Sequence, residues 1–160
     1  ELLLCHGTVC VVGKMRDLIL QLSKSSIYST KPNNRSNPGY FMRNILDYNW
    51  LAVTGACLMM EKRKFLEVGQ FDESFPIAYN DIELCFRNYE AGYYNVVCNA
   101  VELLHHESVS RGVDHIDPQK ALRLSKEKKR LYEKHPQYYQ YDPFFNVNLH
   151  PNGINFEVPF

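Results

Sequence analysis

Short apolar runs alternate with helical segments along this sequence, and this alternation limits the folds that the chain can adopt. Residues 8–13 (TVCVVG) and 51–60 (LAVTGACLMM) are apolar runs of strand length, and similar short runs occupy 93–98 and 101–105. Such runs predict buried strands. Strands that alternate with helices are typical of α/β proteins, in which helices flank a sheet. We therefore expect an α/β fold with a mixed sheet flanked by helices.

Start and stop signals predict three helices. A glycine directly after the last periodic residue ends a helix, which predicts helices over 61–68 and 80–91. Asp117 before Pro118 combines a capping side chain with proline at the first helical position, and predicts a third helix to about His135. The second helix has an apolar face of Ile82, Cys85, Phe86 and Tyr89.

Composition narrows the functional classes. The chain has 160 residues, 45% of them hydrophobic and 22% charged, as in ordinary globular domains. Its formal net charge is zero, so no overall field attracts nucleic acid, and we expect no nucleic-acid partner. The five cysteines form no C-x-x-C pair, and no apolar run has the length of a membrane span. These features predict free thiols and a cytoplasmic protein.

The stretch YNDIELCFR places Asn80, Asp81 and Glu83 at the start of the second helix. One interpretation is a capping box, in which Asn80 caps the backbone and Glu83 reaches back to it. Asp81 would then only complement the helix dipole. The other interpretation is catalytic, because a carboxylate held at a helix start is well placed to act as a general base.

Two further segments carry chemical groups with open interpretations. In LLHHESVSRG, His105 or His106 is a plausible ligand for a divalent metal and Arg111 a plausible phosphate clamp, although a surface histidine pair explains the same residues. The basic excess of the third helix fits a solvated face as well as contact with an anionic membrane or a phosphate.

The order of these motifs resembles the second half of the catalytic domain of family-two nucleotide-sugar glycosyltransferases. The series VTGAC, GQFDESF, NDIELCFR, AGY, HHESVSRG and DPFFNVNL runs in the family's order and at its usual spacing over about residues 38–158. The resemblance is greatest to bacterial enzymes that build O-antigen and other surface polysaccharides. It implies a partial GT-A fold, with residues 1–160 forming the acceptor and catalytic side of the domain.

The resemblance also implies roles for individual residues. Asp81 matches the catalytic base of inverting members, and His105 matches a histidine that helps to hold Mg²⁺ or Mn²⁺ on the donor diphosphate. Glu83 and Arg87 match positions that support the base helix. The positions expected to contact substrate are Gly55, Ala56, Asn80, Glu83 and Arg111. The implied partners are a nucleotide-sugar donor and a glycan or lipid-linked acceptor, the latter with peripheral contact at the inner face of the membrane.

The sequence departs from the family pattern at its beginning. No D-x-D motif occurs, and the nucleotide-binding half that precedes the matched region in the family is absent. We therefore expect the isolated chain to bind donor poorly. One alternative is a catalytically inactive remnant or binding module. Another, a metal-dependent hydrolase built on His105, His106 and Glu107, is disfavoured because adjacent histidines lack the H-E-x-x-H spacing.

Overall fold

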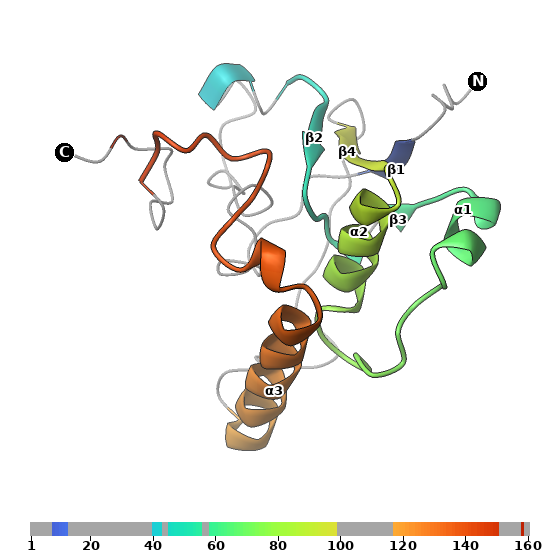
Figure 1. The fold of residues 1–160 in the computed structure, drawn as a ribbon, viewed down its shortest axis with the longest axis vertical. Coiled ribbons are helices and arrows are strands. Elements are labelled where there is room, and N and C mark those ends of the chain that lie inside the picture. Colours follow the sequence, from blue (N-terminus) through green and yellow to red (C-terminus); the bar gives the residue numbers. More distant parts are fainter. Residues whose placement is uncertain are drawn as a thin grey trace.

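The computed structural model describes residues 8–12, 40–42, 45–55, 58–98, 117–150 and 158 (Figure 1). Within these ranges, strands form one mixed sheet in the order β2-β4-β1-β3. The strands are β1 (Thr8–Val12), β2 (Tyr48–Trp50), β3 (Leu58–Met59) and β4 (Tyr94–Cys98). β1 pairs in parallel with β4 and antiparallel with β3, while β2 pairs antiparallel with β4.

Two of the expected strands are confirmed, those over 8–13 and 93–98. Their pairing has a regular register, because Thr8 lies opposite Tyr94 and Val12 lies opposite Cys98. The strand expected over 101–105 lies outside the described residues.

All three predicted helices are confirmed. They are α1 (Lys62–Glu67), α2 (Asn80–Glu90) and α3 (Pro118–Lys134), and a 3₁₀ turn, η3 (Pro136–Tyr138), follows α3. Left-handed glycines follow the first two, with φ of +90° at Gly69 and +84° at Gly92. The Asp117 side chain accepts hydrogen bonds from the N–H groups of Gln119 and Lys120, as its capping role requires. None of the helices in these ranges has the length and apolar character needed to cross a membrane.

The prediction of a single strand over 51–60 is wrong. Leu51, Ala52 and Val53 are all buried, as the apolar run predicted, yet they form no strand. Their backbone is irregular. A side chain replaces part of the missing strand pairing, because Asn95 Nδ2 donates a hydrogen bond to the carbonyl of Leu51 at 2.9 Å. The apolar composition was therefore a signal of burial, and only Leu58–Met59 forms a strand.

The hydrophobic core gathers around the apolar face of α2. Ile82, Cys85 and Phe86 are buried there, and Tyr89 packs against them. The remaining core comes from distant segments, namely residues 50–53, Phe75, Leu131 of α3 and Tyr138 of η3. Figure 1 shows the C-terminal end of α3 close to α2, with the rest of α3 extending away. The core thus anchors the helix whose first turn contains Asp81.

Candidate active site

The Asp81 carboxylate lies in the first turn of α2 and contacts the irregular segment after β2. Its Oδ2 accepts a hydrogen bond from the Gly55 N–H at 2.7 Å, and its Oδ1 accepts one from the Ile82 N–H at 2.9 Å. The residue is half-buried. Two backbone donors from separate segments therefore fix the orientation of the carboxylate, which is the preorganisation that a general base requires.

Gly55 is close enough to Asp81 that its missing side chain matters. A Cβ atom at position 55 would lie 3.2 Å from the Cβ of Asp81, which is tighter than ordinary contact. The pairing of Gly55 with Asp81 therefore brings together two residues that the sequence predicted separately as part of the site. Ala56, the adjacent predicted residue, lies outside the described residues.

Burial raises the pKa of Asp81 above its ordinary value. The hydrogen bonds from the N–H groups of Gly55 and Ile82 act in the opposite direction, because they stabilise the charged form. A carboxylate with a raised pKa is a stronger base than one in water, and it still accepts hydrogen bonds that keep it oriented.

The predicted capping box is wrong. The N-cap residue of α2 is Tyr79, in the left-handed region with φ of 62° and ψ of 1°, and no side chain caps the helix. Asn80 is already helical, and its Oδ1 accepts a hydrogen bond from the Asp81 N–H at 2.8 Å. Glu83 does not reach back to Asn80 because its carboxylate is committed to other partners. Asn80 is half-buried beside Asp81, where the sequence predicted a substrate contact.

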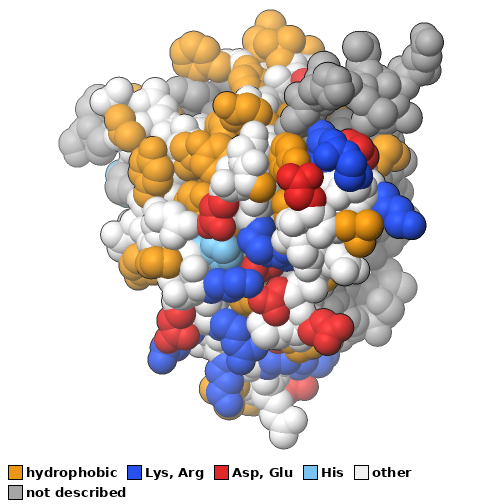
Figure 2. All heavy atoms as spheres, turned by 45° about the vertical axis from the view of Figure 1, so that its right-hand side comes forward, with side chains coloured by type: hydrophobic (Ala, Val, Ile, Leu, Met, Phe, Trp, Pro, Cys, Tyr) orange, Lys and Arg blue, Asp and Glu red, His pale blue; other side chains and the backbone are white. Residues whose placement is uncertain are grey.

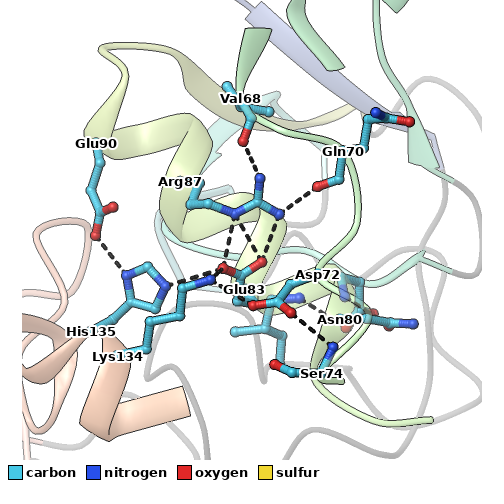
Figure 3. A network of polar contacts seen from close by, with 12 residues as sticks. Val68, Gln70, Asp72, Ser74, Asn80, Glu83, Arg87, Glu90, Lys134 and His135 are labelled. Carbon is cyan, nitrogen blue, oxygen red and sulfur yellow. Dashed lines mark hydrogen bonds and ion pairs between the residues drawn. The ribbon is translucent and has the colours of Figure 1, made fainter. Parts of the chain in front are cut away.

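Glu83 lies at the centre of a polar network that joins α2 to the end of α3 (Figure 3). Its side chain is fully buried. Arg87 binds it in a bidentate manner, with Nε 2.8 Å from Oε1 and Nη2 2.7 Å from Oε2. Lys134 Nζ donates to Oε1, and His135 Nε2 lies 3.4 Å from the same atom. The network favours a supporting role for Glu83, because its oxygens face protein cations.

The network extends outward from Glu83 in two directions. On one side, His135 Nδ1 lies 2.7 Å from Oε1 of Glu90, at the other end of α2. On the other side, Lys134 Nζ binds Oδ2 of Asp72 at 2.7 Å. Arg87 also donates to the carbonyls of Val68 and Gln70, so the network holds the link that follows α1. The polar network therefore connects α2, α3 and this link.

The charges of this network shift one another's pKa values. Burial alone would raise the pKa of Glu83, but hydrogen bonds from His135, Arg87 and Lys134 outweigh it and lower the pKa to about 2. Burial would lower the pKa of His135, but its hydrogen bonds to Glu83 and Glu90 dominate and raise it. Glu83 is therefore negative at neutral pH, and its charge favours the protonated form of His135.

His105 and Arg111, the predicted metal ligand and phosphate clamp, lie outside the described residues. Among the residues that the structure does describe, no group of three or more His, Cys, Asp or Glu side chains could hold a metal ion. These ranges therefore do not supply a binding set for Mg²⁺ or Mn²⁺ by themselves.

One face of the molecule combines charged and apolar surface. Figure 2 shows basic and acidic side chains intermingled over the centre of this face, with hydrophobic side chains gathered above them. The polar network also reaches solvent, since the side chain of Lys134 is 39% exposed while that of Glu83 is buried. Sequence reasoning missed Lys134 and His135, because nothing in a basic helix end indicates a distant buried partner.

Comparisons with known proteins relate part of the chain to others. An uncharacterized protein of Sinorhizobium fredii, y4gI, is 42% identical over 113 residues, which is 69% of this chain and 12% of that protein. The O-antigen biosynthesis protein RfbC of Myxococcus xanthus is 45% identical over 69 residues, 42% of this chain and 5% of RfbC. The N-acetylglucosaminyl-diphospho-decaprenol L-rhamnosyltransferase of Mycobacterium tuberculosis is 37% identical over 65 residues, 41% of this chain and 20% of that enzyme.

The chain spans at most a fifth of the length of these relatives. No family model matches it. No solved structure matches it either. Over part of its length, the chain is therefore similar to proteins named for glycosyl transfer and for O-antigen biosynthesis.

Proposed function

We propose that this chain forms the acceptor side of a glycosyltransferase of partial GT-A fold, with Asp81 as the general base. The main support for this proposal is the geometry of the Asp81 carboxylate. Two backbone N–H groups orient it at the start of a helix, and burial raises its pKa. The names of the relatives support sugar transfer as the reaction class. The order of motifs along the chain supports the same class.

In the proposed reaction, Asp81 takes the proton from an acceptor hydroxyl as that oxygen attacks the anomeric carbon of the donor sugar. The new bond joins the acceptor oxygen to the anomeric carbon, and the bond from that carbon to the diphosphate oxygen breaks. The electron pair leaves with the nucleoside diphosphate. Attack opposite the departing group inverts the anomeric centre. Asp81 later returns its proton to water.

Other residues would support this step without taking part in it. Gly55 holds the carboxylate by its N–H and leaves room for it, because a side chain there would press on Asp81. Arg111 is proposed to face the leaving diphosphate, and His105 to help hold a Mg²⁺ or Mn²⁺ ion. Such an ion would stabilise the charge of the departing diphosphate when bound.

The proposed partners are a nucleotide-sugar donor and a glycan or lipid-linked acceptor. One relative's name specifies a sugar on diphospho-decaprenol, which supports a lipid-linked acceptor. Such an acceptor would bring the protein to the inner face of a membrane. The intermingled basic side chains of Figure 2 are compatible with a peripheral contact of this kind.

The test is the substitution Asp81→Asn in the natural protein that carries this chain. Asparagine keeps the size of the side chain but cannot take a proton, so we expect kcat to fall by about 10²–10⁴-fold with little change in KM. Transfer from a panel of nucleotide sugars to a polyprenyl-diphosphate sugar provides the measurement.

Glu73→Gln is the matched control, because this carboxylate is exposed in the link before α2. It should leave kcat unchanged. Wild-type turnover in Asp81→Asn would refute the role of Asp81, and the absence of any transfer by the wild-type protein would refute the reaction class.

A further inference from the structure

The link between Phe71 and Tyr79 contains no helix or strand, yet it leads directly to Asp81. Three side chains of α3 hold it. Lys134 binds the Asp72 carboxylate, Arg130 donates to the carbonyl of Ser74, and Glu127 accepts from the N–H of Ala78. Positions 127, 130 and 134 share one face of a helix. The link therefore runs antiparallel along α3, with its last contact just before α2.

Tyr79, at the end of this link, has an unfavourable backbone conformation. Its left-handed φ of 62° costs about 1–2 kcal/mol for a residue with a side chain. No side-chain cap compensates at the helix start. This geometry therefore depends on contacts from outside α2. Within the described part of the chain, the half-buried ring of Tyr79 packs against the core, and Glu127 binds the preceding residue.

Glu127 lies where it can support the start of α2, although burying its carboxylate costs free energy. It is 3% exposed, and its Oε2 lies 2.7 Å from the Ala78 nitrogen. Its Oε1 faces Nε of Arg123 at 3.6 Å, which is an ion pair and too long for a hydrogen bond. A buried carboxylate with a single short hydrogen bond contributes little net stability. Its negative charge beside the start of α2 is nevertheless favourable to the helix dipole.

We propose that Glu127 is a positioning residue for Asp81. By holding the Ala78 N–H, it fixes Tyr79 in the left-handed conformation from which α2 begins, and the first turn then brings the Asp81 carboxylate to the Gly55 N–H. The kinetic part of this inference rests on the proposed function of Asp81 as the base. The structural part, from Glu127 through Ala78 to Asp81, does not depend on it.

Three substitutions in the natural protein test the inference. Glu127→Met keeps the length and helix propensity of the side chain but removes the acceptor. Glu127→Gln retains an acceptor oxygen and should rescue the wild-type behaviour. Glu133→Met is the matched control, because Glu133 lies on the same helix with an exposed side chain and only a 3.6 Å pair with Lys129.

The first readout is the titration of the Asp81 carboxyl by carbon NMR. Burial raises the pKa of Asp81, and its hydrogen bonds to the N–H groups of Gly55 and Ile82 act to lower it. Loss of the Gly55 bond in Glu127→Met, with the carboxyl still buried, should therefore raise the pKa above the wild-type value, while Glu127→Gln and Glu133→Met leave it in place. General destabilisation would not move this pKa in the folded molecules. An unchanged Asp81 pKa in Glu127→Met would overturn the proposal.

The second readout is the pH dependence of sugar transfer. A base works when it is deprotonated, so the acid limb of kcat should move to higher pH in Glu127→Met. Displacement of the base should also lower kcat about 10- to 100-fold with KM little changed. If the wild-type protein transfers no sugar, the proposed function fails while the carboxyl titration still decides the inference.

The third readout is amide exchange in the wild-type protein, which needs no folded Met variant. Ala78 precedes the helix, and its amide donates to the Glu127 carboxylate, so we expect slow exchange of this amide in the wild-type protein. Exchange as fast as in an unstructured peptide would overturn the proposal. Protection that is retained in Glu133→Met and in Glu127→Gln would support it.

Discussion

At the scale of single residues, the close contact between Gly55 and Asp81 limits which side chain position 55 can carry. The two residues are far apart in sequence, and one hydrogen bond of 2.7 Å joins them. The approach is possible because Gly55 has no Cβ, which would lie 3.2 Å from the Cβ of Asp81. That neighbouring atom is attached directly to the helix backbone, so it cannot move aside as the end of a flexible side chain can.

The substitution Gly55→Ala tests this constraint. We expect the added methyl group to displace Asp81 or the segment that contains Gly55, at a cost of about 1–3 kcal/mol in stability. Sugar transfer should fall by more than stability accounts for, since misplacement of a catalytic group by about 1 Å can cost 10²-fold. The measurements are the free energy of unfolding from urea titrations and kcat at saturating substrate. Full activity in this variant would show that the Gly55 contact does not orient the base.

At the scale of elements, α2 and α3 obtain their starting points in different ways. The side chain of Asp117 caps α3 locally, with Oδ1 2.9 Å from the Gln119 nitrogen. By contrast, α2 has no side-chain cap and begins from a left-handed tyrosine that other elements support. A buried asparagine binds the middle of α2, because Asn95 of β4 donates to the carbonyl of Cys85 at 3.0 Å. The helix that carries the site is thus the one that depends most on tertiary contacts.

The substitution Asp117→Ala tests the local cap. It should destabilise the protein by about 1 kcal/mol, since two N–H groups lose their acceptor. The acid limb of the pH–rate profile should not move, because the Asp117 side chain binds backbone N–H groups in the first turn of α3 itself. Urea unfolding and the rate profile check the two statements.

Gln119→Ala is the control for Asp117→Ala, because Gln119 contributes only its backbone N–H to the cap. This exposed position should change stability by no more than a few tenths of a kcal/mol. A shift of the acid limb in Asp117→Ala would contradict the separation between the two helix starts.

At the scale of the whole molecule, a chain with zero formal net charge contains a cluster of charged groups around the buried carboxylate of Glu83. Glu83 accepts from Arg87 and Lys134 and also contacts His135. Buried pairs of this kind add little net stability, yet removing one partner leaves the others uncompensated. The network joins α2, α3 and the link after α1, so we expect these segments to lose their structure together.

The pH dependence of stability tests this network. The folded pKa of Glu83 is lowered from 4.5 to about 2, so its contribution is present above pH 4.5 and is lost as pH falls towards 2. The pKa of His135 is raised above 6.5, so its contribution is present below pH 6.5 and is lost as pH rises through the folded value. Both contributions are therefore present together between pH 4.5 and 6.5.

Glu83→Gln should lower the free energy of unfolding by up to about 3–5 kcal/mol in that window, because Arg87, Lys134 and His135 lose the buried carboxylate that they share. The deficit should shrink as pH falls below 4.5, where wild-type Glu83 loses its own contribution. Urea titrations from pH 3 to 9 provide the measurement. Glu133→Gln is the matched control, since its exposed pair with Lys129 is worth at most about 1 kcal/mol. A deficit independent of pH would contradict the ionised network.

The sequence by itself predicted the helices well, because their signals are local. Gly69, Gly92 and the Asp117–Pro118 pair act on the backbone beside them, and each ends or starts a helix where expected. The strands over 8–13 and 93–98 also follow from short β-branched runs. Asp81, Gly55 and Asn80 were singled out by motif order, and the structure places them side by side.

What the sequence did not predict depends on segments distant along the chain. The run 51–60 contained enough apolar residues for a strand. Instead, Asn95 donates a hydrogen bond to its backbone, and its side chains pack in the core with those of α2. Asn80 and Glu83 had the spacing of a capping box. The Glu83 carboxylate instead contacts Lys134 and His135, which lie about fifty residues later in the chain. The local pattern therefore determined which segments are helical, because capping and glycine conformations act within a few residues. Only the tertiary structure decided the partners of the buried charges, because such a pairing exists only when separate elements meet.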